Sequence, residues 1–210
     1  CASVALQVRT SLDAMAVEST PPAIVVTPMQ WTDTVWRTFS CYRSSMDGDR
    51  LEPITIQWAA TAEEIRAQLE RRGWAEGTRL SAHSILSLVS PDVAATALPV
   101  LPRLNNGQPS VLVFTRAHMN ADERDVLRFW PTQYAVAHRG GQPPTPIWLG
   151  SLVHERLLRP SWPFNVLRRD RRIDSMIADH GAASPWSGLE VARSTGCVGI
   201  PVTLVASERQ

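Results

Sequence analysis

Strand-like patterns dominate the second half of the chain. Three successive segments have alternating or continuous apolar residues, and we expect them to form antiparallel strands joined as a meander. These segments are residues 110–116, 126–136 and 146–157. Shorter segments of the same character are residues 4–9, 23–27, 54–58, 189–194 and 198–206. The pattern predicts an α+β fold, mainly an antiparallel sheet, with two to three helices packed against it.

Helical patterns are fewer and have clear boundary signals. A capping box at Thr61 and Glu64, followed by Gly73 as a left-handed terminator, predicts a helix over residues 61–72. Apolar spacing predicts further helices at residues 82–89 and 168–180. The sequence Asn105-Asn106-Gly107 predicts a tight turn ahead of the first of the three strands.

Length and charge limit the classes of protein that fit. The 210 residues suffice for one sizeable core, and we predict a single domain over residues 29–210 after an N-terminal lead-in and tether over residues 1–28. All 21 basic residues are arginine and the net charge is +1, so we expect no nucleic-acid partner. A run of about 18 apolar residues, which a membrane-spanning helix needs, does not occur in this sequence.

The cysteines indicate a place in the bacterial envelope. Cys1, followed by Ala2 and Ser3, suits a lipoprotein whose signal peptide is cleaved before the lipidated cysteine, and acyl chains on Cys1 would anchor the domain in the membrane. Cys41 and Cys197 are able to form a disulfide in an oxidising compartment, and two buried free thiols are the alternative. These features predict a lipid-anchored protein at the periplasmic face.

Motifs that carry chemistry are scarce. None of the five histidines is spaced from another as in a zinc motif, so we predict no metal, and no glycine-rich phosphate loop or serine nucleophile elbow suggests a cofactor or a catalytic residue. His154 and Glu155 are adjacent on a predicted strand and therefore point to opposite faces of the sheet. The candidate anion- or partner-binding residues are Arg128, His154, Arg168, Arg169, Arg171 and Arg172.

Tryptophans on the predicted strands allow two interpretations. Trp58, Trp130 and Trp148 either pack in the core of the sheet or line an apolar groove for a ligand. The aromatic residues Trp31 and Trp36, which precede the first helix, are expected to anchor the core.

Several segments together resemble one known family. The order Trp31, Trp36, Tyr42-Arg43, PITIQWA at residues 53–59 and Gly73-Trp74 is similar to the LssY C-terminal domain. The second half agrees through LPVLP at residues 98–102, LRFWP at 127–131 and PIWLGS at 146–151. The resemblance covers residues 29–156. It differs at Asn105, where family members often have a histidine, and it supplies no catalytic residue.

The resemblance and the cysteines lead to a functional hypothesis. In larger members of the family this domain follows membrane domains that resemble DedA transporters and lipid phosphatases, which implies a role beside envelope lipid handling or secretion. We therefore expect a non-catalytic, lipid-anchored accessory protein that binds an integral membrane protein or complex. The alternative is a hydrolase or ligand-binding accessory acting on lipid phosphates, with Arg128, His154 and the 168–172 arginines at one cleft. A third interpretation is a structural protein whose family motifs all lie in the core.

Overall fold

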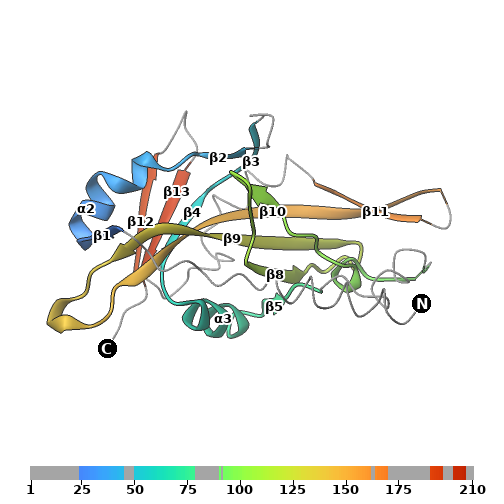
Figure 1. Ribbon diagram of the computed structural model, residues 1–210. Coiled ribbons are helices and arrows are strands. Elements are labelled where there is room, and N and C mark those ends of the chain that lie inside the picture. The colour runs from blue at the N-terminus through green and yellow to red at the C-terminus, as the bar shows by residue number, and fades with distance from the viewer. Residues whose placement is uncertain are drawn as a thin grey trace, which may run out of the picture.

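A nine-stranded sheet organises the molecule (Figure 1). The computed structural model describes residues 24–44, 50–78, 90, 92–161, 164–169, 190–195 and 201–206. Strands β8 (Leu112–Ala117), β9 (Glu123–Val136) and β10 (Thr145–Ser161) pair antiparallel in chain order. The expectation of a mainly antiparallel sheet with few helices is therefore confirmed.

Shorter strands extend this centre on both sides. β4 (Ile56–Ala59) and β11 (Phe164–Arg169) both pair with β10, and β5 (Ala75–Glu76) pairs with β8. Two pairings are parallel and were not predicted: β1 (Ile24–Val26) with β9, and β13 (Pro201–Ala206) with β4. β12 (Glu190–Thr195) forms the edge beside β13. Because β1 belongs to the main sheet, the residues expected in a lead-in segment reach the core at Val26.

Two small hairpins lie outside the main sheet. β2 (Tyr42–Ser44) pairs with β3 (Arg50–Pro53), and β6 (Leu104–Asn105) pairs with β7 (Gln108–Pro109). Asn106 and Gly107 join β6 to β7 with φ angles of 49° and 80°. Two successive positive φ angles are typical of a type I′ hairpin turn, so the predicted tight turn is confirmed.

Two α-helices lie within the described residues. In α3 (Ala62–Glu70), Thr61 Oγ1 accepts from the backbone N–H of Glu64, and a Glu64 carboxylate oxygen accepts from the N–H of Thr61, so the predicted capping box is confirmed. Gly73 follows with a φ of 77°. The other helix, α2 (Pro28–Asp33), has a capping box of its own that was not predicted. The 3₁₀ turns are η1 (Val35–Thr38), η2 (Ala95–Ala97) and η3 (Arg139–Gly141).

One helix prediction was wrong where the structure tests it. Arg168 and Arg169 end strand β11, where they pair with Arg156 and Glu155 of β10. Cross-strand hydrogen bonding outweighs the helical spacing of the local sequence there. The rest of the predicted helix at 168–180, and the whole of that at 82–89, lie outside the described residues.

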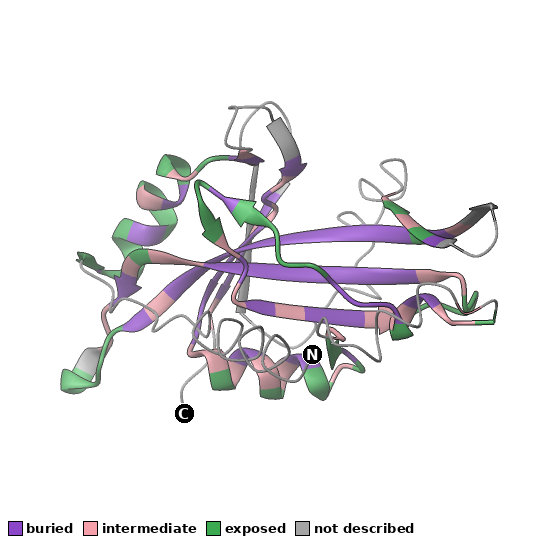
Figure 2. Ribbon diagram, turned by 45° about the vertical axis from the view of Figure 1, so that its right-hand side comes forward, coloured by how far each residue is buried: buried purple, intermediate pink, exposed green. Residues whose placement is uncertain are grey.

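The two faces of the sheet pack against different elements. On one side, which we call the α3 face, Phe114, Leu127 and Phe129 pack with Ile65 and Leu69 of α3. On the opposite side, α2 and η1 cover the end of the sheet around Ala59 and Ile147 through Trp31 and Trp36. Figure 2 shows that β9 and β10 are buried along most of their length. Trp58, Trp130 and Trp148 are all buried, so the core interpretation of these tryptophans is confirmed.

An extended segment crosses the face opposite α3. We call residues 98–103 the strap and this side of β9 and β10 the strap face. The carbonyl of Leu98 accepts from Arg124, and that of Arg103 accepts from the indole N–H of Trp130 at 2.8 Å. Between these two ties Val100 packs on Val126 and Val153. The strap is therefore fixed to β9 at both of its ends.

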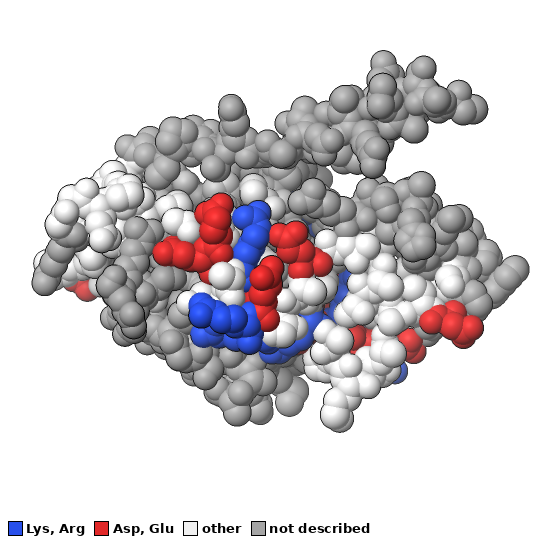
Figure 3. Space-filling model, turned by 90° about the horizontal axis from the view of Figure 1, so that it is seen from below, with Lys and Arg blue, Asp and Glu red and all other residues white. Residues whose placement is uncertain are grey.

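The face of the molecule that carries α3 has charges of both signs. Arg66 pairs with Glu76 at 2.9 Å, and acidic and basic side chains are interleaved on the face shown in Figure 3. Such a face offers no uniform field to a polyanion. Among the described residues, no helix has the length and hydropathy that a membrane span requires.

Candidate functional site

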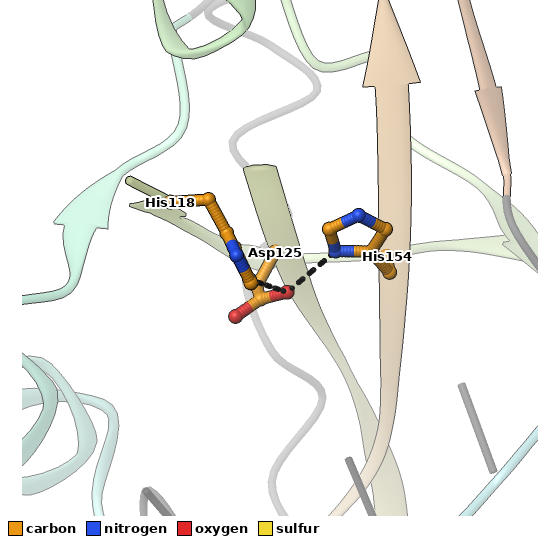
Figure 4. Close-up of side chains that lie close together, drawn as sticks. All are labelled: His118, Asp125 and His154. Carbon is orange, nitrogen blue, oxygen red and sulfur yellow. Dashed lines mark hydrogen bonds and ion pairs between the residues drawn. The ribbon is translucent and has the colours of Figure 1, made fainter. Parts of the chain in front are cut away.

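Strand pairing on the α3 face brings one aspartate next to two histidines (Figure 4). Asp125 lies in β9, and His154 is its direct register partner in β10. His118 follows β8, at the start of the turn that leads into β9. Residues far apart in sequence therefore converge, and we call His118, Asp125 and His154 the histidine–aspartate site.

One carboxylate oxygen connects the three side chains. Asp125 Oδ1 lies 3.1 Å from His118 Nε2 and 3.1 Å from His154 Nδ1. The two imidazole rings meet edge to face with their centroids 4.7 Å apart. The side chains of Asp125 and His154 are only 1% exposed, whereas that of His118 is 37% exposed. The site is thus buried on one side and reachable from solvent through His118.

Further charged residues hold this group in place. Arg116 Nη2 donates to the second carboxylate oxygen of Asp125 at 3.0 Å, and its guanidinium lies over the ring of Trp74. Glu123 Oε2 is 3.7 Å from Nε2 of His154, the ring nitrogen that does not face Asp125. Each of the two buried members of the site therefore has an outer partner of opposite or complementary charge.

The arrangement permits two kinds of chemistry. Because a carboxylate oxygen accepts, His118 Nε2 and His154 Nδ1 both donate to Asp125 if nothing else is bound. One ligand atom from each of the three residues lies within 4.8 Å of the other two, which is a spacing able to hold one metal ion. In a tetrahedral zinc site with bonds of about 2.0–2.1 Å, neighbouring ligand atoms are about 3.3 Å apart, close to the two nitrogen–oxygen distances here.

A different cluster occupies the strap face of the same strands. Glu155 Oε2 accepts from Arg124 Nε and Nη2 at 2.9 and 2.8 Å, and its Oε1 accepts from Arg128 Nη2 at 3.1 Å. Arg124 Nη1 also donates to the carbonyls of Ala95 and Leu98. We call Arg124, Arg128 and Glu155 the arginine–glutamate cluster. All three residues are at most 7% exposed.

Burial and charge oppose each other in this cluster. Burial alone would raise the pKa of Glu155, but the guanidinium groups of Arg128 and Arg124 outweigh it and lower the pKa below its usual value. Burial lowers the pKa of Arg124, against the opposing effect of Glu155. An arginine nevertheless stays protonated in proteins, so the cluster contains two positive charges and one negative charge.

The structure separates the residues that the lipid-phosphate hypothesis places at one cleft. Arg128 contacts Glu155 on the strap face, whereas His154 contacts Asp125 on the α3 face, so the two lie on opposite sides of the sheet. Adjacent residues His154 and Glu155 indeed point to opposite faces, as the strand pattern predicts. Arg168 is exposed and Arg169 is half-buried in β11, and Arg171 and Arg172 lie outside the described residues.

The described residues include only one of the three cysteines for which the sequence makes a prediction. Cys41 is buried and disulfide-bonded. Cys197, its expected partner, and Cys1, the expected lipidation site, lie outside the described residues. The pairing with Cys197 and the acylation of Cys1 therefore stay predictions.

Sequence reasoning missed His118 and Asp125 as members of a site. Sequence motifs identify ligands that lie on one helix or loop, whereas these ligands meet only through the register of β8, β9 and β10. The strand predicted from the sequence begins at Val126, whereas β9 begins at Glu123, so the prediction leaves Asp125 outside the strand. A signal was nevertheless present: extending the predicted strand 126–136 by three residues toward the N-terminus sets Asp125 opposite Arg116, which is two residues before His118.

Comparison with known proteins assigns the chain to a family. No curated protein and no solved structure matches it. The family model described as LssY C-terminus matches residues 36–171, a span that contains the histidine–aspartate site, the arginine–glutamate cluster and the strap. The match covers more than half of the sequence, so the chain belongs to the LssY C-terminus family.

Proposed function

We propose that the domain binds one divalent transition-metal ion, of the zinc type, through His118 Nε2, His154 Nδ1 and Asp125 Oδ1. The observation that carries this proposal is the position of both ring nitrogens 3.1 Å from the same carboxylate oxygen. Two imidazoles and one carboxylate are a ligand set that suits zinc and neighbouring transition metals, whereas magnesium and calcium prefer oxygen ligands.

The outer partners of the site support metal binding. A metal-ligating histidine usually has a carboxylate, carbonyl or water next to its other ring nitrogen. Glu123 is in that position for His154, since metal at Nδ1 places the ring proton on Nε2, which faces Glu123 at 3.7 Å. Arg116 holds the second oxygen of Asp125 and so leaves the first oxygen directed at the two rings.

The exposure of His118 suggests an open site. Structural zinc sites have four protein ligands, whereas catalytic sites have three and keep one position for water or substrate. Three ligands are present here, and the side chain of His118 is 37% exposed. An ion at this site would present its fourth position toward solvent, where it could lower the pKa of a bound water or accept an oxyanion.

The competing interpretation is a hydrogen-bonded group without metal. Asp125 would then only hold the two imidazole rings, and Arg116 would balance its charge. Isothermal titration calorimetry of the full chain with Zn²⁺, after treatment with a chelator, distinguishes the two. We expect binding of one ion per chain, weakened at least tenfold in His118→Ala, because one of three ligands is lost.

His138→Ala is the matched control. His138 is a partly buried histidine that contacts Thr145 near the distant β9–β10 turn. We expect its substitution to leave the affinity for Zn²⁺ unchanged. Absence of Zn²⁺ binding by the wild-type chain, or equal affinities in wild type and His118→Ala, would overturn the proposal. Substitution of Co²⁺ adds a second readout, because its visible absorption reports four-coordinate geometry.

A second proposal concerns location rather than chemistry. We propose that the protein is a lipid-anchored accessory at the periplasmic face of the bacterial envelope, bound to an integral membrane protein or complex. The disulfide at Cys41 supports it, since disulfides persist in oxidising compartments such as the periplasm. Intact-mass measurement of natively expressed protein is the test. We expect an acyl mass increment on Cys1 and a co-purifying membrane partner, and an unmodified solitary chain contradicts this proposal.

A further inference from the structure

The strap face holds two buried polar side chains that each have one polar atom without a hydrogen bond. Arg128 in β9 and Ser151 in β10 are direct register partners, and they are 2% and 0% exposed. Of the polar atoms buried in the described part of the chain, Arg128 Nε and Ser151 Oγ are among those that make no hydrogen bond. A buried polar group without a partner is destabilising, so such groups are rare and call for an explanation.

Charge at this position is also unbalanced. Glu155 shares its two carboxylate oxygens between Arg124 and Arg128, which leaves the three side chains with a net charge of +1. Arg124 also donates from Nη1 to two backbone carbonyls, but Arg128 keeps Nε unused. The strap above has the sequence LPVLPR, which offers no acidic side chain to neutralise the excess.

The apolar surroundings of Arg128 and Ser151 make water an unsuitable ligand at this position. Val126 and Val153, which pack with Val100 of the strap, form the next row of the strap face on one side of Arg128 and Ser151. Trp130 and Leu149 form the next row on the other side. In apolar surroundings an uncompensated charge is far more costly than an unpaired dipole. A bound anion accepts both hydrogen bonds and neutralises the excess positive charge, whereas a water molecule only forms the hydrogen bonds.

We propose that Arg128 Nε and Ser151 Oγ bind a small monovalent inorganic anion, of the size of chloride, beneath the strap. Direct cross-strand partners have Cβ atoms about 4.5–5.5 Å apart, so the guanidinium and the hydroxyl can donate to one small ion between them. The serine hydroxyl rotates freely enough to present its proton to the anion. The three segments that resemble family motifs supply this site: Arg128 from LRFWP, Ser151 from PIWLGS and the covering strap from LPVLP.

Thermal unfolding at constant ionic strength tests the proposal. Sodium chloride is exchanged for sodium gluconate, whose bulky anion does not fit, with a metal chelator present throughout. We expect the melting temperature to rise with chloride, because a ligand that binds only the folded state stabilises it. Ser151→Ala removes one of the two donors, and we expect it to require about tenfold more chloride for the same rise.

Ser110→Ala is the matched control. Ser110 is also a buried serine, but its hydroxyl accepts from the backbone N–H of Arg103. This variant should lose stability yet keep the full response to chloride. An equal response in Ser151→Ala and Ser110→Ala overturns the proposal, as does the absence of any response in wild type. A larger response to phosphate than to chloride also overturns it, in favour of an oxyanion site.

A crystal grown in sodium bromide gives an independent readout. We expect an anomalous peak within hydrogen-bonding distance of Arg128 Nε and Ser151 Oγ. A water molecule there without anomalous signal contradicts the proposal. Since these residues lie on the face opposite His118, Asp125 and His154, the result does not depend on whether the domain binds metal.

Discussion

Neighbouring residues of β9 and β10 point to opposite faces of the sheet and lie in different environments. Arg124 and Glu155 face the strap and are tied to each other and to backbone carbonyls. Asp125 and His154, one residue along each strand, face the other way and meet His118 just beyond the end of β8. The strap covers the first group, whereas the second remains open through an exposed ring. The same strand register therefore builds one closed and one accessible polar site.

The difference in burial between the two sites predicts how each responds to substitution. A buried ion pair adds little net stability, but removal of one partner leaves the other charge buried and uncompensated. Exposed groups are re-solvated when a partner is lost. We therefore expect substitutions on the strap face to reduce the free energy of unfolding, and substitutions of His118 to act mainly on ligand binding.

Arg124→Ala should have the largest effect. It leaves the carbonyls of Ala95 and Leu98 without their donor and removes two hydrogen bonds to Glu155. We expect a loss of about 3 kcal/mol or more in the free energy of unfolding, measured by urea denaturation, because several buried acceptors lose their hydrogen bonds together. Arg66→Ala, in an exposed pair, should lose no more than about 1 kcal/mol. Similar losses in both variants would show that the strap face is not a closed site.

Acidic pH should destabilise the strap face through Glu155. The pKa of Glu155 is lowered from its usual value of 4.5, because Arg128 and Arg124 outweigh the effect of burial. The carboxylate therefore binds protons less readily in the folded than in the unfolded state. Its contribution to stability is full above about pH 4.5 and is lost as the pH falls through the lowered pKa.

The variant Glu155→Gln tests this contribution. Urea denaturation from pH 7 to pH 3, with a chelator present, should show that wild type loses more stability on acidification than Glu155→Gln does. The variant starts from a lower stability at pH 7, so the comparison concerns only the change with pH. Parallel curves for the two proteins would mean that Glu155 does not contribute to the acid sensitivity.

Gly150 of β10 lies opposite Phe129 of β9, where close packing leaves little room for a side chain. A Cβ atom on Gly150 would lie 2.8 Å from Cε1 of Phe129 and 3.0 Å from Cβ of Ile56. We expect Gly150→Ala to lose about 1–3 kcal/mol by overpacking, as measured by urea denaturation. Ser151→Ala, at the next position, removes an unpaired hydroxyl and should be near neutral without added anion. If Gly150→Ala is equally neutral, the side chains of Phe129 and Ile56 shift to accommodate the methyl group, and the packing on this face is less tight than the contacts indicate.

Much of the fold could be predicted from the sequence, because local signals determine it. The capping box at Thr61, the terminator Gly73 and the turn at Asn106-Gly107 each satisfy a local backbone requirement. The three central strands follow from apolar patterns. The parallel pairings of β1 and β13 could not be predicted, since they depend on contacts between segments distant in sequence.

The candidate site was less predictable than the fold. Each histidine stands alone in the sequence, and only the register of three strands brings His118 and His154 to one oxygen of Asp125. Arg168 and Arg169 show the opposite error, since their helical spacing is overruled by pairing with β10. Local patterns thus predicted the three central strands and α3, but a site assembled across strands requires the register itself.

His118→Ala should have only a small effect on stability but a large effect on the response to metal. Asp125 keeps Arg116 and His154 as partners in this variant, so we expect a loss of only about 0.5–1 kcal/mol in the free energy of unfolding. Wild type should unfold at a higher temperature with Zn²⁺ than with chelator, whereas His118→Ala should show little of this increase. Asp125→Asn, buried on the same face, should lose both the response to Zn²⁺ and more stability. If His118→Ala instead retains the full response, the accessible face binds metal without its exposed ring, and the contrast between an open and a closed site no longer holds.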